Sequence, residues 1–360
     1  MKLKIYKSYI LKSYLNYFLI VTLIFTLLSF FLNILEEIVF FEKYDVGALY
    51  PVIVTFLNTP SILFEIFPFI FLISSQLFFI NFRENEELNL LKLKGIDNFS
   101  LIRFLIYLTL IMGLIVTIVF YTFSANLKHS YLSIKNKFTN DNKYLAAINN
   151  NGLWIKDEYD GNIYVINADE FVKNTLKNVT INQLDSKFNL KSIIVSEKAN
   201  IEKQEWDLEK VRINYANGKK ENLEKLKVTT NFNREKLNSI FSNLNSLNLL
   251  QLLNLSEDYK KLGLSSTEIR SHIYKLYSFP ILMCIMAAIG SILVLTFSNK
   301  RSKFFNLSLG ILASVVIYYI NYFFNLLGTT EKTSILLSVS SPLIILILFC
   351  FIFLVRINEQ

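Results

Sequence analysis

A polar block in the middle of the chain, from Ala125 to about Arg270, constrains the fold more than any other feature. The block is charged and strand-like, and three long apolar runs lie on each side of it. A hydrocarbon core about 30 Å thick is crossed by about 20 apolar residues in a helix. The runs that meet this length are about 14–35, 61–82, 100–124, 273–297, 304–327 and 335–355. The sequence therefore predicts an α-helical membrane protein with six transmembrane helices and an inserted all-β domain.

The expected domain limits follow from this layout. Residues 1–124 hold the first three spans, residues 125–270 the inserted domain, and residues 271–360 the last three spans. The composition agrees, because 52% of the residues are hydrophobic, including 32 Phe and 19 Tyr, which is rare in a soluble domain. Cys284 and Cys350 both lie within apolar runs, which favours packing over metal binding or a disulfide. The first run is too long for a cleaved signal peptide and is typical of a retained anchor.

The basic residues predict which side of the membrane each loop occupies, because positive charge concentrates in loops that stay in the cytoplasm. The bases near the ends of the apolar runs are Lys2, Lys4, Lys7, Lys12, Arg83, Lys92, Lys94, Arg103, Lys300, Arg301, Lys303 and Arg356. They flank alternate ends of the runs, so both termini are expected in the cytoplasm and the polar block in the periplasm. This pattern also explains the net charge of +8 better than a nucleic-acid site would.

The polar block carries alternating apolar and polar residues, which indicate β-strands. Segments 162–166, 190–195 and 206–215 show this period, with a phase slip at Glu209 and Lys210 that would suit a β-bulge. Asn217-Gly218 is a strong hairpin turn. Six or seven short strands predict a sandwich, a jellyroll or an open barrel. From 237 to 264 the period lengthens toward that of a helix, which predicts a helical connector back to the membrane.

The stretch before the second span contains two prolines, Pro60 and Pro68, near the start of the apolar run. Residues 46–57 follow Asp45, which is a suitable N-cap, so the sequence predicts a short interfacial helix here.

The loop between the second and third spans has the pattern of a short, sharply ended helix over 84–95. Acids occupy its first turn, bases its last, and Gly95 follows as a C-cap. Leu88 and Leu91 lie on one face, joined in part by Leu90. One interpretation is an amphipathic helix that rests on the inner leaflet. The other is a docking helix that presents Glu87 and the leucines to a cytoplasmic partner.

Motifs for catalysis are missing from the sequence. No phosphate-binding loop occurs, since neither Gly218-Lys219-Lys220 nor Gly328-Thr329-Thr330 supplies one. The two histidines, His129 and His272, have no partner at a useful spacing. Three acids at the ends of spans could mark a polar cavity or could cap the interface; they are Glu36, Glu37 and Glu65. We therefore expect a protein that is not an enzyme and holds no metal or cofactor of its own.

Several segments resemble the LptF/LptG permeases of the lipopolysaccharide exporter, over nearly the whole chain. Residues 59–68 resemble the family's proline-bracketed start of the second span, and Glu86-Glu87-Leu88 followed by Gly95 resembles its coupling helix. Residues 152–157 resemble the first strand of the jellyroll in the LptG branch. With Leu35-Glu36-Glu37 at the end of the first span, this favours LptG over LptF.

This resemblance implies six spans, a periplasmic jellyroll and a role as one permease subunit of an ABC transporter. The implied partners are an LptF-like permease, an LptB-like ATPase dimer that binds ATP and Mg²⁺, an LptC-like single-span protein and an LptA-like periplasmic bridge. Lipopolysaccharide would be extracted from the inner membrane and passed toward the outer membrane. The residues implied to dock on the ATPase are Glu86, Glu87, Leu88, Leu91 and Gly95.

One departure from the family concerns the lysines that meet lipid phosphates near the end of the first span. Their positions fall on Asn33, Val39 and Phe40 in this sequence. The bases left as candidates for headgroup contact are Lys43, Lys135 and Lys137, of which Lys137 matches a basic family position. This departure disfavours phosphate contact through the first span and would suit a headgroup that carries fewer phosphates.

Other functions remain open at this point. A membrane-anchored scaffold would use the outer domain to hold a partner, while its spans stay passive. A membrane enzyme is disfavoured because no catalytic constellation occurs. A permease for lipoprotein release is a neighbouring alternative, although such proteins usually have four spans.

Overall fold

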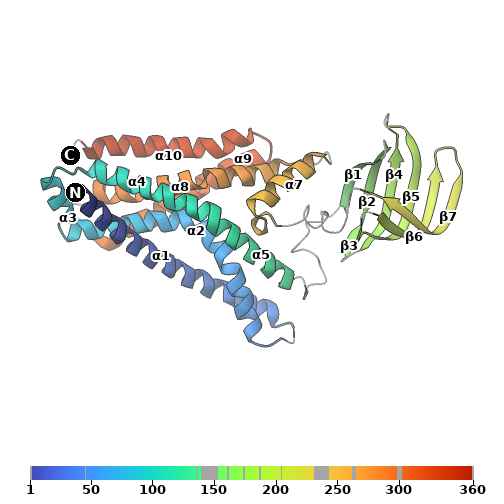
Figure 1. The fold of residues 1–360 in the computed structure, drawn as a ribbon, viewed down its shortest axis with the longest axis horizontal. Helices are drawn as coiled ribbons and strands as arrows, with labels where there is room; N and C mark the ends of the chain where they lie inside the picture. The colour runs from blue at the N-terminus through green and yellow to red at the C-terminus, as the bar shows by residue number, and fades with distance from the viewer. Residues whose placement is uncertain are drawn as a thin grey trace. The chain divides into compact units, whose positions relative to one another are not determined.

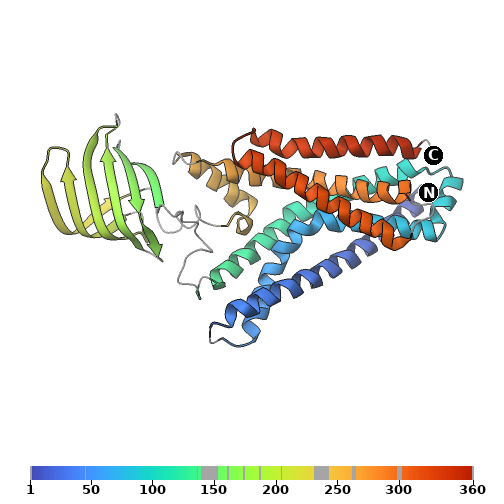
Figure 2. The same ribbon diagram turned by 180° about the vertical axis from the view of Figure 1, so that it is seen from behind.

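The computed structural model describes residues 2–44, 46–135, 137–138, 153–159, 162–172, 175–185, 188–203, 205–230, 243–261, 265–297 and 302–358. The chain divides into two compact units (Figures 1 and 2). One contains Met1–Lys128 and Thr267–Gln360, and the other contains His129–Ser266. The first unit is helical, and the second contains the β-strands.

Six helical segments of the described residues are long and apolar enough to cross a membrane, which confirms the predicted number of spans. They are Tyr6–Phe41, Leu49–Glu84, Asn98–Lys135, Thr267–Thr296, Lys303–Thr329 and Ile335–Ile357. The corresponding elements are α1 (Lys2–Phe41), α2 (Leu49–Glu84), α4 (Asn98–Ile115) with the π-helical turn η1 (Val116–Phe120) and α5 (Tyr121–Lys135), α8 (Thr267–Phe297), α9 (Lys303–Thr329) and α10 (Ile335–Asn358). The short helix α3 (Glu87–Leu93) joins α2 to α4.

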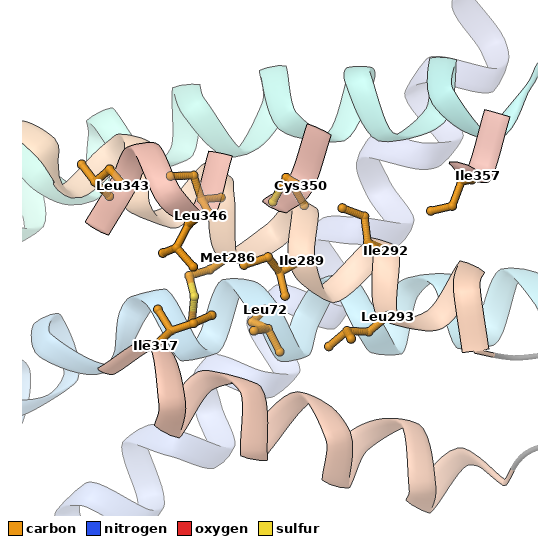
Figure 3. Packing of buried hydrophobic residues seen from close by; sticks show 12 residues of the cluster. Leu72, Met286, Ile289, Ile292, Leu293, Ile317, Leu343, Leu346, Cys350 and Ile357 are labelled. Carbon is orange, nitrogen blue, oxygen red and sulfur yellow. The ribbon is translucent and has the colours of Figure 1, made fainter. Parts of the chain in front are cut away.

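Helices α2 and α8 form the centre of the helical unit and are mostly buried, whereas the other candidate spans are mostly exposed. Figure 1 shows α4 in front of this central pair, and Figure 2 shows α9 in front of it from behind. Between α2, α8, α9 and α10 lies a cluster of buried apolar side chains (Figure 3). Its labelled members are Leu72, Met286, Ile289, Ile292, Leu293, Ile317, Leu343, Leu346, Cys350 and Ile357. The two cysteines, Cys284 and Cys350, are both free and buried.

Helix α2 differs from the prediction for this part of the chain. The expected separate helix over 46–57 is wrong, because Leu49–Glu84 form one helix that runs through Pro60 and Pro68. Asp45, the expected N-cap, lies outside the described residues. Figure 1 shows that α2 changes direction along its length, as expected for prolines in a helix interior. Unpaired backbone groups are costly in an apolar environment, so bending the helix is favoured over ending it.

The β unit contains one antiparallel sheet of seven strands. They are β1 (Leu153–Tyr159), β2 (Asn162–Ala168), β3 (Glu170–Val172), β4 (Thr175–Leu184), β5 (Leu190–Asn200), β6 (Glu205–Tyr215) and β7 (Lys220–Thr229). Their order is β1-β2-β4-β5-β6-β7, and β3 pairs with β4. The inserted antiparallel β domain is therefore confirmed. Among the described strands the order is that of a meander, so the crossover connection of a complete jellyroll stays a prediction.

The turns and connectors of this unit agree with their sequence signals where the structure describes them. Asn217 and Gly218 form the β6–β7 hairpin turn, with Gly218 at φ +81°. The predicted helical connector over 237–264 contains a 3₁₀ turn, Leu244–Ser246, and helix α7 (Leu249–Lys261). Residues 237–242 and 262–264 of that prediction, and Gly152 of the predicted first strand, lie outside the described residues.

The phase slip in β6 has a different cause from the predicted bulge. A bulge places two residues opposite one, but Glu209 pairs with Lys198 and Val211 with Ser196, so the register does not shift. Instead Lys210 has a left-handed backbone, φ +53°, and so does Asn178 in β4, φ +51°. Glu197 is on β5, the strand between these two, and its Oε2 lies 2.6 Å from Lys210 Nζ. At this row the pairing of β4 with β5 and of β5 with β6 is interrupted, and the alternation of buried residues shifts by one position.

Candidate functional site

Helix α3 is the candidate site that the sequence indicated, and its two ends are set by local backbone geometry. Helix α2 ends at Glu84, and Glu86 adopts a left-handed backbone with φ +56° before α3 begins at Glu87. The helix is therefore shorter than the predicted 84–95, because Glu84 belongs to α2 and Asn85 and Glu86 form a turn. Figure 1 places α3 at the same end of the helical unit as both chain termini.

The C-terminal end of α3 is capped at Gly95, as predicted from the sequence. Gly95 has φ +79°, its N–H donates to the Lys92 carbonyl at 2.9 Å, and the Ile96 N–H donates to the Leu91 carbonyl at 3.0 Å. This pair of bonds is a Schellman motif. Two residues later, the Asp97 side chain accepts a hydrogen bond from Ser100 N and caps α4. The bond to Ser100 holds the pKa of Asp97 below its ordinary value.

Replacing Gly95 by alanine is expected to destabilise this helix end by about 1 kcal/mol, because a Cβ is disfavoured at positive φ. Nothing lies within 4 Å of the added Cβ, so the effect is one of backbone conformation alone. Hydrogen exchange of the Gly95 and Ile96 amides measures it. Gly47→Ala also adds a Cβ in open space, without a positive φ, and serves as the control. Equal exchange in both variants would contradict the assignment.

The predicted docking residues do not share one exposed face. Glu86 and Gly95 are exposed, but Leu88 is only 6% exposed and Leu91 is half-buried, so both leucines pack toward the bundle. The exposed apolar residues are instead Leu90 and Leu93, with exposed fractions of 55% and 84%. Leu93 was missed in the sequence. The spacing of Leu90 and Leu93 by three residues was the available signal, since it places them on a common face.

Glu87 is half-buried, and its side chain faces the first span. Tyr9 of α1 donates a hydrogen bond from its hydroxyl to Glu87 Oε1 at 2.9 Å. The other oxygen, Oε2, is buried and has no hydrogen-bond partner among the described residues. The carboxylate is thus engaged within the chain and is not an outward-pointing charge.

Two further bonds tie the end of α2 to other helices. Arg83 Nη1 donates to the carbonyl of Val294, in the last turns of α8, at 3.2 Å. Lys303 Nζ, at the first residue of α9, lies 2.6 Å from Glu84 Oε2. Together with the Tyr9–Glu87 bond, the segment 83–87 therefore contacts three spans. The sequence showed these residues as charges but could not show their partners.

The first turns of α9 are also held against α2 deeper in the bundle. Gln76 Nε2 donates to the Asn306 carbonyl at 2.9 Å, and both side chains are fully buried. A Cβ at Gly310 would overlap with the end of the Gln76 side chain, so a larger residue here would require that side chain to move. Helix α9 is thus attached to α2 over its first two turns.

The three candidate lipid-contacting lysines differ in exposure. Lys43, in the helical unit, and Lys137, in the β unit, are exposed. Lys135 is 7% exposed, and its Nζ donates to the Tyr131 hydroxyl at 2.9 Å. Its position favours a packing role over contact with a headgroup.

A row of hydrogen-bonded polar side chains joins the C-terminal half of the first span to the second and third spans. Asn58 Nδ2 donates to Asn33 Oδ1 at 3.0 Å, and Lys128 Nζ donates to Asn58 Oδ1. Asn33 therefore points into the bundle, while Val39 is 62% exposed. Of the acids noted in the sequence, Glu37 is buried, whereas Glu36 and Glu65 are exposed. Lys128 was missed as a member of this cluster because its contacts depend on the packing of three spans.

Comparison with known proteins identifies one family. A family model described as lipopolysaccharide export system permease LptF/LptG matches residues 8–356. The match extends from the first candidate span to the sixth and includes the β domain between the third and fourth. No curated protein matches the chain.

Proposed function

This chain belongs to the LptF/LptG family of lipopolysaccharide export permeases, and we propose on that premise that it extracts lipopolysaccharide from the inner membrane and passes it to a periplasmic bridge. As a permease subunit of an ABC transporter it is a multi-pass inner-membrane protein. ATP would be hydrolysed by a partner, an LptB-like ATPase dimer that binds ATP and Mg²⁺. The lipid would move from the membrane unit into the β domain.

The observation that carries this proposal is the construction of α3. A seven-residue helix is closed by a Schellman motif, Glu87 at its start contacts α1, and the adjoining end of α2 contacts α8 and α9. Leu90 and Leu93 remain exposed on its outer side. Apolar side chains on a short, well-anchored helix suit a groove on a partner protein. Force applied to this helix would reach α1 directly, and α8 and α9 through the end of α2.

The proposed orientation has both termini and α3 in the cytoplasm and the β domain in the periplasm. Its support is the distribution of bases, since Lys92 and Lys94 flank the end of α3, and the termini lie at the same end of the helical unit (Figure 1). The second permease would be LptF-like, this chain taking the LptG role, with an LptC-like protein beside them and an LptA-like bridge beyond. Lys43 and Lys137 are the exposed bases proposed to meet the headgroup.

A pull-down from the native membrane tests the docking role of α3. Replacing Leu90 and Leu93 together by aspartate should remove the ATPase from the complex, because charged side chains cannot enter an apolar groove. Leu250→Asp in α7 is a matched control, since Leu250 is 73% exposed. The purified wild-type chain alone should show no ATP hydrolysis. Retention of the ATPase by the Leu90/Leu93 variant would refute the docking surface.

Depletion of the chain tests export itself. Lipopolysaccharide should accumulate in the inner membrane if the chain is a transporter subunit. A passive scaffold for the β domain predicts normal arrival of lipopolysaccharide at the outer membrane, and that result would refute the proposed function.

A further inference from the structure

The third span contains a π-helical turn, Val116–Phe120, in the middle of its length. Such turns are rare and are often found at functional sites. We infer that this turn is a movable joint, and that the hydrogen bond between Tyr121 and His272 holds it in its present place. Movement of the turn along the helix would rotate the part of the span that precedes the β unit in the chain. The use of this motion in transport rests on the proposed function.

The π-helical turn adds one residue to the span. Its closing bond runs from the Tyr121 N–H to the Val116 carbonyl, five residues earlier, where an α-helix spans four. Helix α4 precedes the turn and α5 follows it, and the three form one long helix (Figure 1). In an uninterrupted α-helix Phe120 would stand where Tyr121 now stands, because each residue turns the helix by about 100°. The extra residue therefore decides which side chain faces the second and fourth spans.

Tyr121, the first residue of α5, contacts two neighbouring helices. Its ring lies 5.0 Å from the ring of Phe64 on α2, and its hydroxyl oxygen lies 3.2 Å from His272 Nε2 on α8. Tyr121 is 3% exposed and lies within a candidate span, where water does not readily replace a lost hydrogen bond. If the turn moved past Tyr121, this side chain would rotate by about 100° and leave His272. The hydrogen bond therefore opposes that movement.

The start of α8 provides a fixed neighbour for this bond. Ser271, next to His272, donates a hydrogen bond to Asn325 Oδ1 on α9 at 2.9 Å. Four residues earlier, Thr267 donates to Glu331 Oε1, just beyond the end of α9, at 2.8 Å. Since α8 is attached to α9 at two points here, the movable partner in the Tyr121–His272 contact is α5.

Thr117 shows that the turn leaves a polar group unsatisfied. Its Oγ1 is buried and has no hydrogen-bond partner among the described residues. In an α-helix, this hydroxyl would reach the Gly113 carbonyl, four residues earlier. A buried hydroxyl without a partner is costly, so regaining α-helical geometry around Thr117 would favour movement of the turn. Other threonines of the spans make the equivalent bond; they are Thr22, Thr26, Thr55, Thr59 and Thr122.

Spin labels on α5 and α8 measure the movement in the purified full chain, without a partner protein. They are placed at Phe123→Cys and Tyr277→Cys, whose native side chains are 54% and 55% exposed. The buried Cys284 and Cys350 are replaced by alanine. Phe123 lies just after Tyr121, so a label here would rotate by about 100° when the turn passes it.

Tyr121→Phe should add a second distance between the labels or broaden the distribution, because the bond to His272 is lost while the ring can still pack on Phe64. Tyr107→Phe is the matched control, since Tyr107 is on α4 of the same span and is 64% exposed. It should give wild-type distances. Identical distances in Tyr121→Phe and wild type would overturn the inference.

Deletion of Ile118 distinguishes a movable turn from a general loosening of α5. Ile118 is 65% exposed, and its removal lets Tyr121 follow Val116 by four positions and keep its place beside His272. The deletion variant should fold. Adding Tyr121→Phe to it should still give a single distance, because no extra residue is left to move. A broad distribution in this double variant, or failure of the deletion variant to fold, would contradict a movable joint.

The assembled transporter tests the use of the joint. Deletion of Ile118 should leave the ATPase bound and active but lower lipopolysaccharide release per ATP about tenfold, within the usual range for coupling between two states. Ile118→Ala keeps the extra residue and should release lipid as wild type does. Equal release by these two variants would refute a role in transport. If the wild-type complex releases no lipopolysaccharide, the proposed function fails, whereas the label distances still decide whether the turn moves.

Discussion

Replacing Gly290 by alanine is expected to destabilise the helical unit by about 3 kcal/mol, the upper part of the range for overpacked cores. Gly290 lies on α8 where this helix crosses α2, and an added Cβ would overlap with the carbonyl oxygen of Leu72. That oxygen belongs to a helical backbone and cannot rotate away as a side chain can. The two central helices would have to separate, which opens the cluster around Leu72, Ile289 and Leu293 (Figure 3).

Unfolding of the purified protein in detergent by increasing amounts of SDS measures this loss. Gly310→Ala is an informative comparison, because its Cβ would meet the end of the flexible Gln76 side chain, which can move. We expect a smaller loss there. Gly47→Ala, with nothing within 4 Å, should resemble wild type. Equal stability of the Gly290 and Gly47 variants would show that α2 and α8 do not approach this closely.

Replacing Trp206 by alanine is expected to destabilise the β unit by about 3–5 kcal/mol, the range for a fully buried aromatic side chain. Trp206 is on β6, is 0% exposed, and shares the buried side of the sheet with Leu208 and Val211. The loss should be large relative to a small domain's total stability. Hydrogen exchange of the β4–β6 amides in the full chain should show faster opening.

Val195→Ala on the neighbouring strand β5 is the control, because Val195 is 39% exposed. Its exchange rates should stay close to those of wild type. Protection of the β4–β6 amides that is equal in the Trp206 and Val195 variants would mean that Trp206 is not part of the core.

Features that depend on local sequence were predictable. The six spans follow from the lengths of the apolar runs, since a bilayer selects for length and hydropathy without regard to neighbours. The Gly95 helix end and the Asn217-Gly218 turn each need a residue that tolerates positive φ, and glycine supplies it at both. The antiparallel strands followed from alternation over 162–166 and 190–195.

Features that depend on packing against another segment, distant in the sequence, were not predictable. Pro60 and Pro68 normally end helices in soluble proteins, but α2 continues through them, and the sequence therefore suggested a boundary that does not exist. The phase slip at Lys210 looked like an extra residue in one strand. It is instead matched by Asn178 in another strand, and one strand's sequence cannot show that match.

The candidate site shows the same division most clearly. The sequence alone determined that a short helix lies between the second and third spans, that it ends at Gly95, and that acids stand at its start. Only the tertiary structure decided which way each side chain faces, because that depends on where α1, α8 and α9 pack. Glu87 meets Tyr9 across 78 positions of the chain, and Glu84 meets Lys303 on α9. Burial of Leu88 and exposure of Leu90 and Leu93 follow from the same packing, which no local pattern encodes.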